Sequence, residues 1–416
     1  MIYTRINNKV SVVMFLPTFS PLPMGGSEIQ TKLLVNELLK NDKLFIITPN
    51  NNFLPSYEII DGIPVYRFKI IRKKSKKKEQ SPTVNYINDP VIFDYSDQKG
   101  IDLLYAPTKL TLKQILGQIN IFICALYYFW KLRKEYNIIQ INTVTFYAVI
   151  VALIGKILNK SVIIKDSTMD GVQKMSSTPF QKVSRRFITQ NCTFVAMTKA
   201  IENNYIKASI PKNRIIRIPN GIDVKYIPKR KSDFEYKCLF VGNLYQQPAK
   251  GIDILIKAWQ IVYTKFPQAK LTIVGDGNIT AYKNHIYDLG LANSIIFTGK
   301  SQPKEYYLTN DIFILPSRRE GMSNALLEAM HYQMTIIATD ISGNQDLIKN
   351  NYSGILIPSN NVEYLTTAID YLFNNQDLAI EMGKKAYQKV IKLYNIKKIA
   401  NSYHDLYLKL NFDKNK

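Results

Sequence analysis

Short apolar runs alternate with amphipathic stretches along almost the whole chain. The first two runs, residues 10–16 (VSVVMFL) and 44–49 (LFIITP), flank a segment in which Leu34 and Leu38 recur at helical spacing. Uninterrupted apolar runs of this length are typical of parallel strands that are buried on both faces. Strands that alternate with helices form βαβ units, so the pattern predicts an α/β protein.

The rest of the first half follows the same alternation. A capping box formed by Ser27 and Gln30 is expected to start the first helix, which should run to about Lys40. We expect further strands at 138–142, 161–166 and 194–198 and a hairpin over 58–69. We expect further helices at 114–136, 145–158 and about 179–190.

A second alternation begins after a break near the middle of the chain. Asn220–Gly221 is a turn signal, and Pro219 and Pro228 punctuate the same segment. Strands are expected at 237–242, 271–277, 294–299, 311–316, 335–339 and 354–358. We therefore predict two doubly wound parallel-sheet domains that face each other across a cleft. Their predicted ranges are 1–218 and 219–395, with a C-terminal helix, 396–416, that packs back on the first domain.

The chemistry concentrates in residues 317–330 (SRREGMSNALLEAM), which follow the apolar run DIFILP. A helix that starts near Ser323 would put Glu320 in the loop ahead of it. Glu328 would then lie about five residues along, or roughly 7–8 Å of rise. Ligands of α/β proteins bind outside the carboxyl ends of strands, and a helix start favours an anion.

Two more loops should reach the same edge of the sheet. Lys250 follows the strand at 237–242, and the VGDG turn (274–277) follows the next strand. A lysine suits phosphate oxygens, and carboxylates accept hydrogen bonds from sugar hydroxyls, so a nucleotide-sugar would fit the whole set. The alternative is that Glu320 caps the helix and Glu328 is a surface residue. In the first half, Gly25–Gly26 either approaches a ligand closely or forms a tight turn.

Charge and composition limit the partners. The 416 residues include 55 Lys and Arg against 32 Asp and Glu, a formal net charge of +23, which favours anionic partners or reflects a lysine-rich proteome. Residues 72–78 (RKKSKKK) form either a solvated loop or a contact with an anionic membrane surface. The helix at 114–136 ends in aromatic and basic residues, which suits a membrane interface as well as a core. No nucleic-acid recognition motif is present, so no nucleic-acid partner is expected.

Scattered cysteines and histidines exclude other classes of site. Three cysteines and three histidines are dispersed without a CxxC pair, so neither a metal site nor a His-based triad is predicted. The apolar segment Ile115–Trp130 contains Gln118 and Asn120 and is too short to span a membrane. We expect a cytoplasmic protein, peripheral on the inner face of the membrane if the basic run binds lipid.

Six motifs in order carry a family resemblance. They are GGSE (25–28), PNGID (219–223), VGN…KG (241–251), VGDG (274–277), FTG (297–299) and EGMSNALLEAM (320–330). With these motifs the sequence resembles the retaining glycosyltransferases of family 4, the glycosyl transferase group 1 type, over nearly its whole length. That resemblance implies the GT-B fold, in which two Rossmann-like domains face each other across a cleft.

The resemblance also implies roles for individual residues. Glu320 would contact the donor hexose, the stretch Gly321, Met322, Ser323 and Asn324 would bind the donor, and Glu328 would hold the ribose hydroxyls. Lys250 would bind the diphosphate, and Gly25 and Gly26 would lie against the donor phosphate or the acceptor. The family needs no metal or other cofactor, since its co-substrate is a nucleotide-diphosphate sugar.

Two positions depart from the family pattern. Asn243, expected at the donor, stands where the family usually has arginine. The first-domain histidine of many members is absent, because the chain reads KDSTMDG at 165–171. Lys165, Asp166 or Asp170 could take its place, and Asp170 is our predicted catalytic partner of Glu320.

The expected function is therefore transfer of a hexose to a glycan or lipid-linked oligosaccharide in cell-surface polysaccharide synthesis. The alternatives are a catalytically silent GT-B partner subunit and a nucleotide-sugar epimerase.

Overall fold

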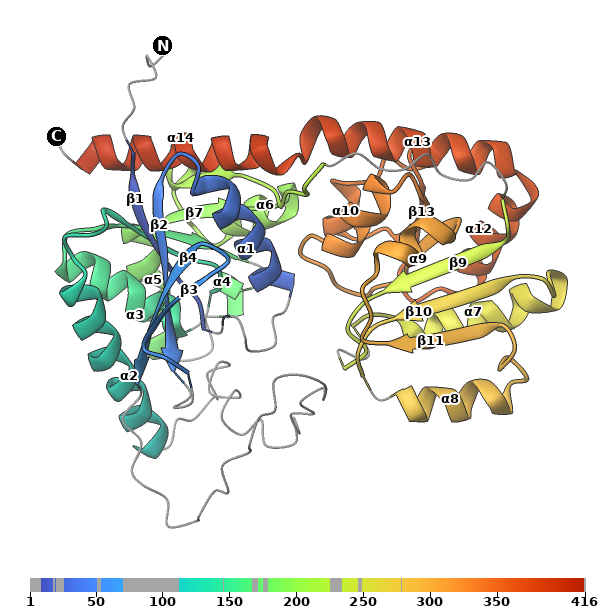
Figure 1. The fold of residues 1–416 in the computed structure, drawn as a ribbon, viewed down its shortest axis with the longest axis horizontal. Helices are drawn as coiled ribbons and strands as arrows, with labels where there is room; N and C mark the ends of the chain where they lie inside the picture. The colour runs from blue at the N-terminus through green and yellow to red at the C-terminus, as the bar shows by residue number, and fades with distance from the viewer. Residues whose placement is uncertain are drawn as a thin grey trace.

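Two α/β sheets organise the chain (Figure 1). The computed structural model describes residues 9–17, 19, 26–50, 54–69, 112–144, 146–166, 171–174, 179–224, 234–245, 249–277 and 279–414. The RKKSKKK segment, Gly25 and Asp170 lie outside these residues. The predicted pair of α/β units is confirmed.

Within the described residues, the first sheet has eight strands in the order β3-β4-β2-β1-β5-β6-β7-β8. Their bounds are Ser11–Phe15 (β1), Lys43–Asn50 (β2), Tyr57–Ile60 (β3), Ile63–Lys69 (β4), Ile138–Ile141 (β5), Ser161–Lys165 (β6), Thr193–Ala196 (β7) and Ile215–Arg217 (β8). Among these described strands only β3 and β4 pair in antiparallel fashion, and Val12 pairs in register with Leu44 on one side and Ile138 on the other. Strand β8 was not predicted, because its three residues carry too little pattern.

Helices cover both faces of this sheet. Their bounds are Gly26–Leu38 (α1), Leu112–Lys131 (α2), Phe146–Ile157 (α3), Gly171–Lys174 (α4), Pro179–Asn191 (α5) and Lys199–Lys207 (α6). The predicted capping box is wrong, because α1 already begins at Gly26. Tertiary contacts occupy both side chains instead: the Ser27 hydroxyl donates to the Asn142 carbonyl, and Gln30 Oε1 accepts from the Gly221 amide.

The second sheet is entirely parallel, in the order β11-β10-β9-β12-β13-β14. Its strands are Lys237–Val241 (β9), Lys270–Val274 (β10), Ile295–Gly299 (β11), Ile312–Leu315 (β12), Thr335–Thr339 (β13) and Ile355–Ile357 (β14). Its helices are Ile252–Lys265 (α7), Ile279–Asp288 (α8), Lys304–Thr309 (α9), Asn324–His331 (α10), Ser342–Gln345 (α11), Val362–Asn374 (α12) and Gln376–Leu393 (α13). The strand order reverses between β9 and β12, which makes their carboxyl ends the topological switch point.

The last helix, α14 (Ile396–Lys414), returns to the first sheet (Figure 1). It packs beside α1, and its Tyr403 and Tyr407 are buried in the same cluster as Val12 of β1. His404 Nδ1 lies 2.9 Å from the buried Asp42 carboxylate, which ties α14 to the loop between α1 and β2.

Candidate functional site

The loops that follow β9 and β12 touch at the switch point. The Arg318 amide donates to the Ala249 carbonyl at 2.7 Å, which joins the two loops through their backbones. Gly251 has a φ of 69°, and a Cβ there would overlap the Pro316 carbonyl oxygen. Only glycine fits this close approach, so the VGN…KG loop brings Lys250 to the end of β12.

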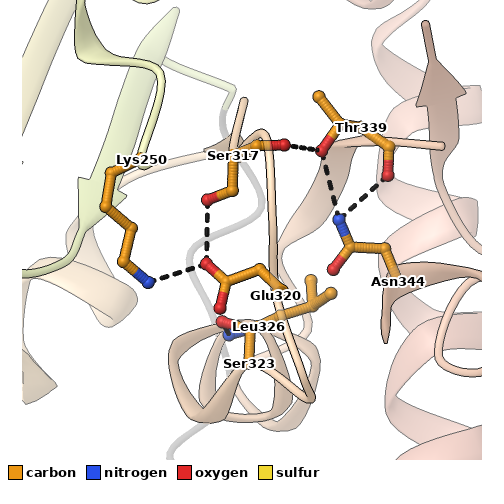
Figure 2. Close-up of polar contacts among 7 residues, drawn as sticks. All are labelled: Lys250, Ser317, Glu320, Ser323, Leu326, Thr339 and Asn344. Carbon is orange, nitrogen blue, oxygen red and sulfur yellow. Dashed lines mark hydrogen bonds and ion pairs between the residues drawn. The ribbon is translucent and has the colours of Figure 1, made fainter. Parts of the chain in front are cut away.

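Lys250 and Glu320 form an ion pair there (Figure 2). Lys250 Nζ lies 2.7 Å from Glu320 Oε1, and the Ser317 hydroxyl donates to the same oxygen at 2.8 Å. The two side chains are 17% and 10% exposed, so the pair is held firmly and still meets solvent. Sequence reasoning assigned both residues to a donor but did not foresee that they pair with each other.

A second layer of hydrogen bonds supports Ser317 from behind (Figure 2). The Thr339 hydroxyl donates to the Ser317 carbonyl at 2.6 Å, and Asn344 Nδ2 donates to the Thr339 carbonyl at 2.9 Å. All three residues are almost fully buried. A Cβ at Gly343 would come within 2.6 Å of the Gly321 carbonyl oxygen, so the loop of Glu320 rests directly on α11. This packing fixes the Glu320 backbone before any ligand binds.

Helix α10 starts where the sequence predicts. Ser323 is its N-cap, and the Ser323 hydroxyl accepts from the Leu326 amide at 3.3 Å. The predicted helix start at Ser323 is confirmed, and the alternative that Glu320 caps the helix is wrong. The positive end of α10 therefore lies just after Glu320 in the sequence. Such a helix end favours phosphate oxygens.

Glu328, in the second turn of α10, is held by a tyrosine from the neighbouring helix. Tyr307 of α9 is 1% exposed, and its hydroxyl donates to Glu328 Oε2 at 2.9 Å. Burial raises the pKa of the Glu328 carboxyl, and the hydrogen bond from Tyr307 partly opposes that rise. Glu328 is not the surface residue of the alternative reading.

Asn324 connects helix α10 to the first domain. Its Nδ2 donates to the Gly26 carbonyl at 2.9 Å, and its Oδ1 accepts from Asn220 Nδ2 at 2.9 Å. Lys165 Nζ in turn donates to Asn220 Oδ1 at 2.8 Å, and the Asn220 amide reaches the Met322 sulfur at 3.3 Å. The GGSE loop, the PNGID segment and EGMSNALLEAM, far apart in sequence, meet at this network.

The Asn243 side chain bonds to its own loop in this structure. The side chain is exposed, and its Oδ1 accepts from the Tyr245 amide at 2.8 Å, which closes a turn of its own loop. The loop also packs on the VGDG turn, where a Cβ at Gly275 would overlap the Gly242 carbonyl oxygen. The Leu244 amide donates to the Asp276 carbonyl at 2.8 Å.

The first domain contributes two buried polar residues next to this network. Lys165 is 6% exposed and Asp166 is 1% exposed, at the end of β6. Burial lowers the pKa of Lys165 to about 8. Within the described ranges, no group of three or more His, Cys, Asp or Glu is placed to hold a metal ion.

Sequence reasoning missed Tyr307, Ser317 and the role of Asn220. Ser317 and Asn220 lie in motifs that the sequence analysis had already singled out, and Asn220 was interpreted only as a turn residue. Tyr307 lies outside every motif, and only its position on α9 reveals its contact with Glu328.

Part of the chain is similar to a known protein family. Residues 226–389 match the model of a family described as glycosyl transferases group 1. An uncharacterized glycosyltransferase of Haemophilus influenzae is 32% identical over 214 residues, 50% of this chain and 59% of the relative. The UDP-Gal:alpha-D-GlcNAc-diphosphoundecaprenol alpha-1,3-galactosyltransferase of Escherichia coli is 30% identical over 210 residues, 47% of this chain and 54% of the relative. The matches thus span little more than half of each relative.

Solved structures match this chain over nearly its full length. Anabaena Alr3699/HepE in complex with UDP superposes with a TM-score of 0.70 and 16% identity, covering 96% of this chain and 100% of that one. At this identity the likeness shows a common fold. It therefore extends the similarity from residues 226–389 to both sheets.

Proposed function

We propose that this chain, whose residues 226–389 match the family described as glycosyl transferases group 1, is a retaining glycosyltransferase. It moves a hexose-type sugar from a nucleotide-diphosphate donor to a glycan or lipid-linked oligosaccharide. The observation that carries the proposal is the Lys250–Glu320 ion pair at the switch point, next to the start of α10.

The pair and the helix start match the two halves of such a donor. Lys250 and the positive end of α10 stabilise the diphosphate, and they stabilise it more strongly as negative charge grows on the departing nucleotide. Glu320 accepts hydrogen bonds from hexose hydroxyls, and Glu328 accepts them from the ribose. These side chains supply the charge stabilisation without a metal, as the family resemblance implies.

Binding of the donor exchanges partners within the pair. In the free protein each charge of Lys250 and Glu320 neutralises the other at 2.7 Å. When the donor enters, phosphate oxygens approach Lys250 and hydroxyls approach Glu320, so neither charge loses a partner. A preformed pair of this kind reduces the cost of ordering the site.

The proposed acceptor follows from the Escherichia coli relative. Its name describes transfer of galactose to a GlcNAc-diphosphoundecaprenol, a sugar carried on a lipid. We extend this acceptor class, and a role in cell-surface polysaccharide synthesis, to the present chain. A silent partner subunit is the second candidate. The exposed Asn243 favours it, because its side chain accepts from the Tyr245 amide of its own loop and the cation usual in the family is missing there.

A panel of nucleotide-sugars tests the proposal. A true donor should raise Tm, because a ligand present at a hundredfold excess over Kd adds about 2.7 kcal/mol to the free energy of unfolding. UDP- and GDP-linked hexoses are compared, and transfer from the stabilising donor to a lipid-linked disaccharide is followed by chromatography. Stabilisation with transfer supports the enzyme, and stabilisation without transfer supports the silent subunit. No shift with any member of the panel contradicts both.

Tyr307→Phe should weaken donor binding without slowing chemistry. The ring stays stacked on Tyr332, with centroids 5.3 Å apart, but the hydrogen bond to Glu328 is lost. We expect KM for the donor to rise by about three- to tenfold with kcat nearly unchanged, because the net contribution of one typical hydrogen bond is about 0.5–1.5 kcal/mol. The increase in KM should become larger as the pH falls. The hydrogen bond from Tyr307 lowers the pKa of Glu328, so its removal favours the protonated acid.

The control for this variant is Tyr287→Phe, at an exposed tyrosine of α8. Its KM should equal that of the wild type at every pH. If Tyr307→Phe behaves like Tyr287→Phe, Glu328 does not hold the donor.

A further inference from the structure

Helix α2 turns apolar side chains outward. Ile119, Ile123, Tyr127 and Trp130 recur every three or four residues and are 47–56% exposed. Between 119 and 131, Lys131 is the one exposed position that is neither aliphatic nor aromatic. The outer side of a surface helix is ordinarily polar. The outward side of α2 is therefore built for contact with something other than water.

The apolar surface continues over the neighbouring helices. Helix α3 packs against both α2 and α5, and all three lie on the side of the first sheet that is away from the second sheet (Figure 1). Leu153 and Ile157 of α3 are 37% and 59% exposed, and Val183 of α5 is 69% exposed. We call these three residues and the four of α2 the α2–α3–α5 face.

The charge of these helices has one sign. Helices α2, α3 and α5 contain no Asp or Glu. Their basic residues are Lys113, Lys131, Lys156, Lys182, Arg185 and Arg186. The positive charge also affects a neighbouring helix. Burial lowers the pKa of Lys414 in α14 to about 8, and the charges of Lys160 and Lys156 lower it in the same direction. Apolar side chains beside basic ones match the surface of an anionic bilayer, which has charged headgroups over an apolar interior.

Two local features strengthen this match. The Arg133 guanidinium lies over the Trp130 ring, 4.2 Å from its centroid, so one aromatic–cation unit stands at the end of α2. Tryptophan with an adjacent cation favours the interface between lipid tails and headgroups. A groove of about 550 Å³ beside α5 is lined by Lys182, Arg185 and Arg186 together with Ser209 and Pro211. Its size and charge suit a phosphate headgroup.

We propose that the α2–α3–α5 face binds the surface of an anionic lipid bilayer. The outward side chains of α2 enter the interface, and the basic residues of α2, α3 and α5 meet lipid phosphates. A second copy of the chain fits less well, because pairing the face with itself brings cations together. Of the helices that the structure describes, none is long and apolar enough to cross a membrane, so this mode of binding is lateral.

Vesicle co-sedimentation of the full chain tests the face. Vesicles of phosphatidylglycerol with phosphatidylcholine are compared with vesicles of phosphatidylcholine alone, at low and high salt. The test variants are Ile123→Gln with Tyr127→Gln, and Lys182→Gln with Arg186→Gln. The matched control is Ile261→Gln with Tyr364→Gln, at exposed positions of α7 and α12. All variants keep residues 72–78, so that basic segment cannot account for a difference among them.

The expected result is salt-sensitive binding to the anionic vesicles only. The apolar variant should lose most of this binding. The affinity of the basic variant for anionic vesicles should fall about fivefold for each charge removed, and the control should bind like the wild type. Equal binding of test and control variants, equal binding of neutral vesicles, or no binding overturns the proposal. So does a dimer, seen by sedimentation without lipid, that the apolar variant dissociates.

Trp130 provides a readout that is independent of sedimentation and of sugar transfer. The chain has two tryptophans, of which Trp130 is 50% exposed and Trp259 is fully buried. Anionic vesicles should shift the emission to the blue, and lipids brominated on their tails should quench it. Trp130→Phe should abolish both changes while the Trp259 signal remains. A Trp130 emission that vesicles leave unchanged contradicts the assignment of α2 to the interface.

Discussion

Glu320→Gln is expected to lower kcat for sugar transfer by about a hundred- to a thousandfold, the range found when one preorganised electrostatic group is removed from an active site. Glutamine preserves the size of the side chain and can still accept a hydrogen bond from Ser317. It carries no negative charge, so it no longer holds Lys250 Nζ at 2.7 Å, in position for the diphosphate. It also replaces one of the two carboxylate oxygens that we assign to the donor hexose by an NH2 group, which cannot accept a hydrogen bond. Both losses act at the reacting end of the donor.

The matched control for Glu320 is Glu381→Gln. Glu381 also pairs with a lysine, Lys385 of the same helix, at 2.6 Å, but its side chain is 57% exposed and lies on α13. Exposed pairs of this kind contribute little, so kcat and Tm should stay close to wild type. Tm of Glu320→Gln is measured beside kcat, because a protein that no longer folds would also lose activity.

A double-mutant cycle measures the coupling between Lys250 and Glu320 separately from the contribution of each residue. Lys250→Met alone should raise the donor KM and lower kcat, and the combination with Glu320→Gln should cost far less than the two single losses together. Groups in one ion pair are coupled, whereas independent residues give additive losses. Additive losses, or an unchanged kcat in Glu320→Gln, would show that the pair does not act on the donor.

The sequence predicts the parts of this site that are local. Strand β12, the loop of Glu320 and the N-cap at Ser323 follow one another without interruption, and the local signals of apolar run and capping residue define each of them. Here short-range chemistry and the final structure agree.

The partners that the sequence does not predict are those that the fold brings together. Tyr307 meets Glu328 only because α9 and α10 are neighbours, and Gln30 meets Gly221 across 191 residues. Ser27 shows the opposite case, in which a strong local capping signal gives way to a contact with Asn142. Tertiary contacts of this kind override local propensity, and a single sequence does not record them.

The second large effect concerns Lys165, which is connected to helix α10 through the side chain of Asn220. Lysine at this buried position loses hydration of its charged form, which lowers its pKa to about 8 from 10.5 in the unfolded chain. Between these two values the unfolded state binds one more proton than the folded state, so the free energy of unfolding must rise with pH. The rise is about 2 kcal/mol between about pH 7 and pH 9.5.

Lys165→Met should remove this rise. Methionine fills a similar volume beside Tyr403 and carries no charge, although Asn220 loses a donor. Denaturant unfolding at several pH values gives the difference between the variant and the wild type, which cancels other groups that titrate in the same range. Lys207→Met, at an exposed lysine of α6, should keep the wild-type rise.

This variant also tests whether the first domain positions helix α10. Without Lys165, Asn220 loses the hydrogen bond that orients its side chain towards Asn324, and Asn324 is the residue that contacts Gly26. We therefore expect a severalfold increase in donor KM as well as the altered pH dependence of stability. A lost pH dependence with an unchanged KM would limit Lys165 to a structural role. A rise of stability with pH that persists in Lys165→Met would contradict the burial of a charge at this position.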